Sequence, residues 1–421
     1  MTASYWQLDA GWRDRWADTA FPHHVDYAVI GAGLAGLATA IRLREQNPTA
    51  DIIVLEAERV GYGASGRNAG FLSPIAAPVW LLGAQRSPEQ AWGAARINAE
   101  MHAIARWLAE RVPDCELEAA RLALQAQSRI SDAALREFAR AVAVVGLPHH
   151  RLESRARPGH LFLEMDAYTV HPYKLVRGLA EHADRQRVRI RERARVRSVE
   201  ALRAGGARVT LDGGGALEAA KVVICANAYT AAIDCGERAP ALVVHSFMTA
   251  TAPVDAATLT RDGDFTVEIN ATQAYHRVHR GRLIYGGIDK LRAPGGDDFA
   301  VPVRERRRLE KAMRASFPGA TLPIEHAWSG RFHATATGLP IVRMAADNHA
   351  IVFNVGYGGT GAALALVCAR LAAAVASHGR FTNVDDTRLL ALVHATRISV
   401  RDSIGALARI ARAATMPWLH T

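Results

Sequence analysis

Three glycines near the N-terminus have the spacing of a site that binds the phosphates of a dinucleotide. They are Gly31, Gly33 and Gly36 of the run GAGLAG, and Glu56 follows twenty residues later. In this pattern the first glycine permits a tight turn, the second lets backbone approach a pyrophosphate, and the third lets helix and strand pack closely. The free N–H groups at the start of the helix bind the anion. Glu56 would accept hydrogen bonds from ribose hydroxyls and disfavours a 2′-phosphate, which leaves FAD or NAD and excludes NADP.

A second run of small residues, GYGASGRNAGF (61–71), comes soon after Glu56. It places four glycines and a serine around one strong cation, Arg67, and has almost nothing that could build a core. Such a loop lets backbone N–H groups face a ligand that is long, flat and anionic in its middle. An NAD site does not need it, so the run favours FAD. We expect Arg67 to lie near the phosphates or the flavin edge; the alternative is a structural arginine paired with a carboxylate.

A strand–helix–strand unit must hold these residues in place. The almost continuous apolar run 25–33 predicts a buried strand, 34–46 carries a helical apolar stripe, and 51–57 predicts a second buried strand. Further along the chain the period changes repeatedly between two and 3.6, as in an α/β protein. We expect mostly helix over 79–152, short strands over 186–226, strands over 241–290, a helix over 303–316, a strand over 351–355 and a helix over 361–378.

The composition is that of a chain with a large core. Half of the 421 residues are hydrophobic, which suits two intertwined domains. No run approaches the length of a membrane span and the N-terminus lacks the features of a signal peptide, so we expect a cytoplasmic protein with no membrane span. The four cysteines form no C-x-x-C pair and no metal-ligand spacing, which predicts free, mostly buried thiols and no metal.

The formal net charge of +10 raises the question of nucleic-acid binding. The basic residues are overwhelmingly arginine and are spread along the chain without a block of five or six like charges. We therefore expect no nucleic-acid partner. The densest runs, 185–197 and 304–314, are interpreted as a polar-faced strand pair and a solvated helix.

The run 61–71 resembles the FAD-binding sequence of the glycine oxidase and D-amino-acid oxidase superfamily of flavin amine oxidoreductases, most of all the gamma-glutamylputrescine oxidoreductase branch. Similar segments extend over most of the chain: SYWQL (4–8), RARVRSVE (193–200), KVVICANAYT (221–230), WSGRFHATATGLPIV (328–342) and NVGYGGTGAALA (354–365). The resemblance implies non-covalently bound FAD, because covalent relatives carry a cysteine near position 330, where this chain has Gly330. It implies these cofactor contacts: Gly31, Gly33, Leu34, Ala35, Gly36, Glu56, Ala57, Ala64, Ser65, Gly66, Arg67, Asn68, Ala69, Gly70, Val196, Ala226, Asn227, Gly330, Gly356, Gly358, Gly359, Thr360 and Gly361.

The expected fold class is α/β (α+β): a Rossmann-like FAD-binding domain interleaved with a substrate domain built on a mixed or antiparallel sheet with helices. We expect a leader over 1–23. The FAD-binding domain would comprise 24–78, 153–240 and 328–380; the substrate domain 79–152 and 241–327; and a C-terminal helical segment 381–421. An amphipathic helix within 397–419 is expected to pack on the protein, the alternative being a surface for a membrane or partner.

The implied reaction transfers hydride from the carbon beside an amine nitrogen to the flavin and gives an imine that water hydrolyses. No obligatory acid–base side chain is expected, and no catalytic residue is named. Simple amino-acid oxidases of the superfamily have an arginine where this chain has Phe332, with Arg331 expected on the other strand face, so an ordinary α-amino acid is disfavoured. The candidate pocket residues, each as readily a core or surface residue, are His245, Tyr275, His276, Arg331 and His333.

The electron acceptor is left open. Some oxidases of the superfamily hold a lysine over the flavin for oxygen activation; that place falls near Ile284, and the nearest lysine is Lys290. Oxygen, with hydrogen peroxide as product, is the expected acceptor. A dehydrogenase passing electrons to a quinone or carrier protein is the alternative, and a non-catalytic FAD-binding protein fits the intact flavin loops poorly. The sequence predicts neither the amine nor the oligomeric state.

Overall fold

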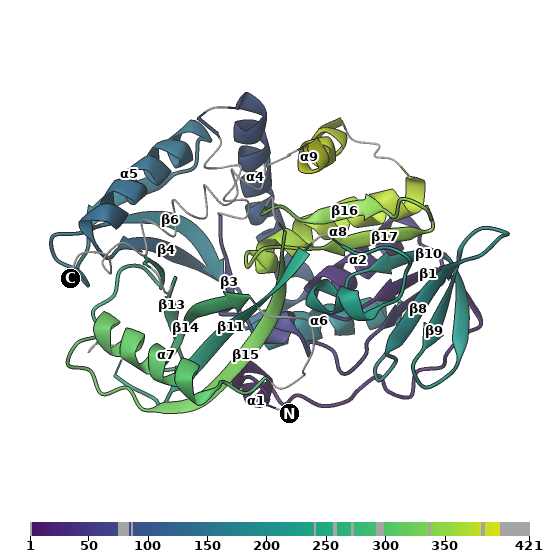
Figure 1. Ribbon diagram of the computed structural model, residues 1–421, viewed down its shortest axis with the longest axis horizontal. Coiled ribbons are helices and arrows are strands. Elements are labelled where there is room, and N and C mark those ends of the chain that lie inside the picture. Colours follow the sequence, from purple (N-terminus) through teal and green to yellow (C-terminus); the bar gives the residue numbers. More distant parts are fainter. Residues whose placement is uncertain are drawn as a thin grey trace.

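The protein is described by a computed structural model that covers residues 2–74, 84–85, 87–239, 241–255, 259–270, 273–291, 299–335, 338–379 and 384–395. Figure 1 shows two sheets side by side with helices packed against them. The chain has the mixed α/β fold that its sequence predicts.

The first sheet carries the predicted strand–helix–strand unit. Its strands run in the order β16-β17-β10-β1-β2-β7, with the β8–β9 hairpin attached to β10. The central strands β17, β10, β1, β2 and β7 are parallel, and β1 and β2 are apolar because helices and neighbouring strands bury them. The bounds are β1 His24–Ile30, β2 Ile52–Leu55, β7 Arg189–Arg191, β8 Val196–Ala201, β9 Ala207–Leu211, β10 Ala216–Ile224, β16 Ile341–Met344 and β17 Ile351–Val355.

Two long helices lie together against the first sheet. They are α2 (Leu34–Gln46), which follows β1, and α8 (Gly361–His378), which follows β17. Both have the bounds that the sequence predicts. Helix α8 is long and apolar enough to cross a membrane, but 67% of it is buried inside the protein, as in a core helix.

The second sheet is mixed and mostly antiparallel. Its order is β15-β11-β14-β13-β12-β4-β6-β3, with β5 paired to β6. Helix α5 (Arg129–Val144) packs near β4 and β6, and α7 (Val303–Ser316) packs on β14 and β11 (Figure 1). The bounds are β3 Phe71–Leu72, β4 Glu118–Ala126, β5 His149–Glu153, β6 Leu161–Thr169, β11 Ala241–Thr251, β12 Phe265–Ile269, β13 Tyr275–His279, β14 Arg282–Leu291 and β15 Ile324–Thr335.

Three segments differ from the sequence-based expectations. Strand β4 lies within the stretch expected to be mostly helical, because it pairs with β6 and with the distant β12. Strand β6 belongs to the second sheet, whereas the sequence predicts its residues within the FAD-binding domain. The run 185–197 is no strand pair, since β7 pairs with β2 while β8 pairs with β9. The division into two domains remains a prediction.

The remaining helices join or cover the sheets. They are α1 (Tyr5–Asp9), α4 (Pro88–Arg111), α6 (Pro172–Arg185) and α9 (Val384–Ala395). All four cysteines are free and buried, as predicted. The amphipathic segment expected within 397–419 lies outside the described residues. Those residues contain no group of three or more histidine, cysteine or acidic side chains that could hold a metal ion.

Candidate functional site

Residues from both sheets line a cavity of about 820 Å³. This volume is in the range, roughly 300–1,000 Å³, typical of sites for small molecules and cofactors. One wall consists of the glycine-rich segments of the first sheet, and the other consists of side chains from the second sheet.

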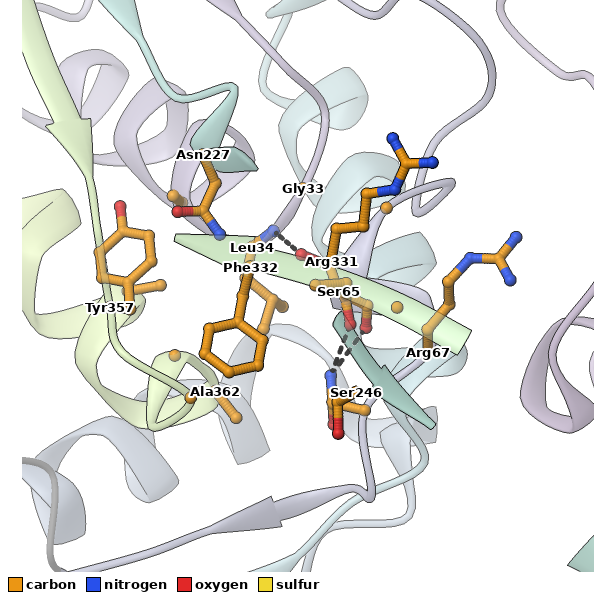
Figure 2. Close-up of a pocket in the computed structure, with 18 of the residues that line it drawn as sticks. Gly33, Leu34, Ser65, Arg67, Asn227, Ser246, Arg331, Phe332, Tyr357 and Ala362 are labelled. Atoms are coloured by element: carbon orange, nitrogen blue, oxygen red, sulfur yellow. Dashed lines mark hydrogen bonds between the residues drawn. The ribbon is translucent and has the colours of Figure 1, made fainter. Parts of the chain in front are cut away.

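The GAGLAG turn forms part of the first wall. Helix α2 begins after Gly33, and Gly33, Leu34 and Ala35 at its N-terminus line the cavity, where a helix start suits an anion. The Leu34 N–H donates to Ser65 Oγ at 2.9 Å, a bond drawn in Figure 2. Gly36 does not line the cavity: a Cβ there would stand 1.9 Å from the Gly31 carbonyl oxygen, so this glycine permits the close helix–strand packing that the sequence predicts.

Glu56 lies at the end of β2 and lines the same wall. Its carboxylate accepts hydrogen bonds from the N–H groups of Ala32 (2.7 Å) and Glu58 (3.0 Å). Burial outweighs these bonds and raises the pKa of Glu56 to about 7. A ligand that donates further hydrogen bonds, as ribose hydroxyls do, would stabilise the carboxylate form.

The run 61–70 folds into a tight loop beside α2. Asn68 bridges it, donating to the carbonyls of Ala64 and Ser65 at 3.2 and 3.1 Å and accepting from the Gly70 N–H at 2.8 Å. A Cβ at Gly66 would stand 2.2 Å from the Gly61 carbonyl oxygen, so Gly66 makes the loop compact and does not itself line the cavity. A Cβ at Gly70 would likewise stand 2.4 Å from the Val170 carbonyl oxygen, so side chains have no room at these two positions.

Arg67 lines the cavity but its guanidinium is buried beside it. It donates to the carbonyls of Tyr62 (2.7 Å) and Thr2 (2.9 Å) and lies 3.7 Å from the ring centroid of Phe299. Burial lowers its pKa to about 10. Among the described residues no carboxylate pairs with Arg67, which contradicts the alternative of a structural arginine paired with a carboxylate. The contact of Arg67 with FAD remains a prediction.

The closing glycine loop, 356–361, leads into α8. Several of its N–H groups are engaged within the protein: Gly356 donates to Asn227 Oδ1 (3.1 Å), Gly358 to the His333 carbonyl (3.0 Å) and Thr360 to the Tyr357 carbonyl (3.1 Å). The first turn of α8, which begins at Gly361, therefore supplies the amides that lack helical partners at the cavity wall. Gly356 itself does not line the cavity.

The second sheet contributes an apolar wall with a few polar groups. Its apolar lining residues are Phe71, Leu122, Leu124, Met248, Val267, Ile269 and Phe332. The polar side chains include Ser246, whose Oγ lies 2.9 Å from the Tyr275 hydroxyl, and Asp289. Sequence reasoning identified Tyr275 but missed Ser246 and Asp289, because only the pairing of β11, β13 and β14 brings them together.

Arg331 and Phe332 on β15 point in opposite directions, as the alternation of a strand predicts (Figure 2). The Phe332 ring extends toward the closing loop, where a Cβ at Gly359 would lie 3.6 Å from it. The Arg331 guanidinium lies 5.7 Å from the Phe299 ring, on the side of Arg67.

The three candidate histidines do not line the cavity. His276 is buried on the far side of β13 from it, stacked on Tyr285 and edge-on to Phe317. His245 and His333 alternate with cavity-lining neighbours on β11 and β15 and are 4% and 2% exposed. Burial lowers the pKa of His276 to about 3 and that of His333 to about 4.

Most of the predicted cofactor contacts line the cavity, on the first wall except for Gly330, which lies on β15 of the second sheet. Those that line the cavity are Gly31, Gly33, Leu34, Ala35, Glu56, Ala57, Ala64, Ser65, Arg67, Asn68, Ala69, Gly70, Val196, Ala226, Asn227, Gly330, Gly358, Gly359, Thr360 and Gly361. Backbone turns, a helix N-terminus and an acid at the end of β2 fit the pyrophosphate and ribose of FAD.

Comparison with known proteins agrees with this geometry. The chain is 27% identical over 384 residues to the probable oxidoreductase OrdL of Rhizobium meliloti (strain 1021), covering 86% of this chain and 84% of that protein. Over 47 residues, 11% of each chain, it is 51% identical to the gamma-glutamylputrescine oxidoreductase of Escherichia coli (strain K12). The fold matches the crystal structure of glycine oxidase from Geobacillus kaustophilus with a TM-score of 0.71 and 22% identity, covering 86% of this chain and 96% of that one. The profile of the FAD dependent oxidoreductase family (DAO) matches residues 26–375, and the chain belongs to this FAD-dependent family.

Proposed function

We propose that the protein oxidises the CH–NH bond of a primary or secondary amine to an imine, which water hydrolyses to a carbonyl compound. FAD supplies the hydride acceptor when bound. The observation that carries the proposal is the arrangement of the cavity: a wall suited to FAD faces an apolar wall, and Phe332 lies between them.

The names of the similar proteins support a nitrogen-containing donor. They include a glycine oxidase, an L-amino acid deaminase from Proteus vulgaris and, over a short segment, a gamma-glutamylputrescine oxidoreductase. All three names refer to substrates that bear an amino group.

The position of Phe332 disfavours a simple α-amino acid. A carboxylate beside the reacting carbon needs a cation or several N–H donors, because burying it unpaired is costly. Phe332 offers an apolar ring there, and Arg331, which also lines the cavity, points away from Phe332 toward Phe299. An amine without an α-carboxylate suits this surface.

The chain's own residues would act by binding and orientation. The apolar residues of the second sheet disfavour the charged form of an enclosed amine, which favours the neutral form that can release hydride. At the other wall, the first-turn amides and macrodipole of α8 would stabilise negative charge that develops during the reaction. No histidine lies among the described lining residues.

The position of Lys290 favours a dehydrogenase as a second candidate. Lys290 pairs with Glu305 of α7, and Ile284 is a fully buried core residue. No lysine occurs among the described residues that line the cavity. Oxygen consumption compared with the reduction of quinones and artificial dyes distinguishes an oxidase from a dehydrogenase.

Anaerobic titration of the holoenzyme tests the proposed reaction. We expect the flavin band to bleach with a primary or secondary amine and to change more slowly with glycine or D-alanine. Efficient bleaching by those amino acids, with the amines inert, would show that the substrate class is wrong. Bleaching by no compound in a panel that includes N-methyl compounds and polyamines would remove the proposed reaction altogether.

A further inference from the structure

A carboxylate on the second wall of the cavity has no charged partner in the described part of the chain. Asp289 of β14 lines the cavity, and no described lysine, arginine or histidine forms an ion pair with it. The neighbouring Lys290 instead pairs with Glu305. Asp289 is exposed to the cavity. A ligand that fills the cavity would bury its carboxylate, which is unfavourable unless the ligand brings a cation or hydrogen-bond donors.

The backbone of β14 places Asp289 on this wall through a β-bulge. On the paired strands His245 lies opposite Lys290 and Phe247 lies opposite Gly287, so that Ile288 and Asp289 together face the single residue Ser246. Bulges of this kind re-aim side chains near functional sites. Ile288 packs into the core beneath α7, and Asp289 lies at the cavity.

The bulge stores backbone strain. Ile288 has φ +60°, a conformation that is rare for a β-branched residue. Conformations of this type persist where the surrounding structure holds them, and they concentrate at ligand sites. A regular strand would avoid this strain, so the bulge is consistent with a functional position for Asp289.

Asp289 is part of a polar group on an otherwise apolar wall. Ser246 Oγ lies 2.9 Å from the Tyr275 hydroxyl, and hydrogen bonding from Ser246 also reaches Asp289. Burial raises the pKa of Tyr275, and the nearby charge of Asp289 raises it further. Two hydroxyls and one carboxylate can accept hydrogen bonds from an ammonium group, which has three donors.

The distance between Asp289 and the predicted FAD contacts indicates which part of the substrate Asp289 would hold. Ser246 pairs with Gly330 on β15, and β14 is the next strand beyond β11. Two strand spacings place Asp289 roughly 10 Å from Gly330. The reacting carbon must lie at the cofactor wall, so Asp289 faces the far end of an extended substrate.

We propose that Asp289, with Ser246 and Tyr275, binds a second, non-reacting ammonium group, and that the substrate is therefore a diamine or polyamine. This inference rests on the proposed amine oxidation. Glu268, the other carboxylate on this wall, is already engaged by Ser316 and by Asn270 (2.8 Å) and would not take this part.

The test compares 1,4-diaminobutane with butylamine, which lacks the second amine. Binding is measured by calorimetry on the dithionite-reduced holoenzyme without oxygen, where no turnover occurs. Asp289→Asn keeps the size of the side chain and removes its charge; Glu268→Gln is the matched control. We expect Asp289→Asn to weaken diamine binding by about 10- to 100-fold, the range for a hydrogen bond to a charged group, and to change butylamine binding less than about 3-fold. Glu268→Gln should change both by less than about 3-fold.

Equal affinities of the wild-type enzyme for the two amines would overturn the inference, as would an equal loss of both in Asp289→Asn. The proposed reaction is tested separately by anaerobic bleaching of the flavin. Binding of the diamine that depends on Asp289, without bleaching by any amine, would support the ammonium site and contradict the proposed oxidation.

Discussion

The protonation state of Glu56 should affect the affinity for FAD. Burial within the protein raises the pKa of Glu56 to about 7. Hydrogen bonds from ribose hydroxyls favour the ionised form, so its pKa must fall when FAD binds. Below pH 7 binding therefore releases a proton, and affinity rises with pH until the ligand-free carboxylate is itself ionised.

We therefore expect FAD affinity to increase by up to about tenfold per pH unit below pH 7 and to level off above it. Glu56→Gln should remove this dependence and weaken binding at pH 8 by about 1 to 3 kcal/mol, because a charge-assisted hydrogen bond is lost. Quenching of flavin fluorescence measures both. An unchanged pH profile in the variant would show that another group titrates.

A substitution of Phe332 should change which substrates the enzyme accepts. Phe332→Arg would place a cation at the junction of the two walls, where an α-carboxylate would lie. We expect the variant to be reduced by glycine or D-alanine at least about tenfold faster than the wild type, since ion pairing offsets the cost of enclosing the carboxylate. Phe332→Leu is the uncharged control. Stopped-flow reduction with no gain for either amino acid, in a variant that retains FAD, would place the carboxylate position elsewhere.

The closing loop and helix α8 act together as one element. Gly359 has φ +89° and faces the cavity, whereas Gly379, at the other end of α8, has φ +63° and nothing within 4 Å of an added Cβ. Leucine at either position strains the backbone by a similar amount, roughly 1–2 kcal/mol. Only the leucine at Gly359 would push a ligand away from the first-turn amides.

We expect Gly359→Leu either to lose FAD or to reduce it about 10² to 10³ more slowly, the usual cost of losing one preorganised donor. Gly379→Leu should lower thermal stability and leave the reduction rate unchanged. Stopped-flow reduction and the flavin redox potential measure the effect. A Gly359→Leu enzyme with the rate and potential of the parent would show that this loop does not contact the reacting edge of the flavin.

Helix α1 holds the 61–70 loop from outside. The Ser4 hydroxyl donates to the Gly66 carbonyl at 2.7 Å, Gln7 Nε2 donates to the Gly61 carbonyl at 3.0 Å, and Trp6 is fully buried. The leader therefore stabilises the loop conformation that the cofactor wall requires.

Two capping-box serines allow this role to be tested. Ser4 caps α1 and also contacts the loop, while Ser128 caps α5, away from the cavity. Each alanine variant should lose about 1 kcal/mol of stability through its cap. Ser4→Ala should also weaken FAD binding by about 3- to 10-fold, as expected for one lost hydrogen bond. Thermal unfolding and FAD titration separate the two effects; equal FAD affinities of the two variants would deny α1 a role at the site.

The elements that the sequence predicts well are those specified by local pattern. The bounds of α2, α7, β17 and α8 agree with the expectation because apolar period, glycine turns and strand length are all encoded within each segment. Strand β4 was missed because its apolar positions are buried by β6 and β12, which are remote in sequence. The glycine runs of the first wall are local patterns, so the sequence alone predicts them. The grouping of Ser246 with Asp289 depends on a bulge between two strands, and no local pattern in the sequence indicates it.

At the scale of the whole molecule, the cavity lies where two differently built sheets meet. The first sheet is largely parallel and presents backbone turns at the carboxyl ends of its strands, where α/β proteins bind ligands. The second is mostly antiparallel and presents side chains, which can vary without disturbing the cofactor wall. Under the proposed function, the first sheet would bind the cofactor and the second sheet would recognise the substrate.

The core around the second sheet contains neutral histidines that should make stability depend on pH. Burial lowers the pKa of His171 and of His333 to about 4 and that of His276 to about 3. In the unfolded chain these groups titrate near pH 6.5. Their contribution is fully present above about pH 6.5 and is lost as the pH falls toward 4, because the unfolded chain then binds protons that the folded protein does not.

The acids with raised pKa values act in the opposite direction, but saturating FAD would hold Glu56 ionised in the folded state. We therefore expect the free energy of unfolding of the holoenzyme to fall on acidification from pH 7 to 5, by at most about 1.4 kcal/mol per pH unit for each histidine. His276→Phe keeps an aromatic ring against Tyr285 and Phe317. It should reduce the slope of the unfolding free energy against pH by the amount that corresponds to nearly one proton, about 1.4 kcal/mol per pH unit. His150→Gln, on the exposed side of β5, is the control and should leave it unchanged. Urea unfolding at several pH values gives the slopes, and a His276→Phe slope equal to that of the wild type would show that His276 is protonated in the folded core.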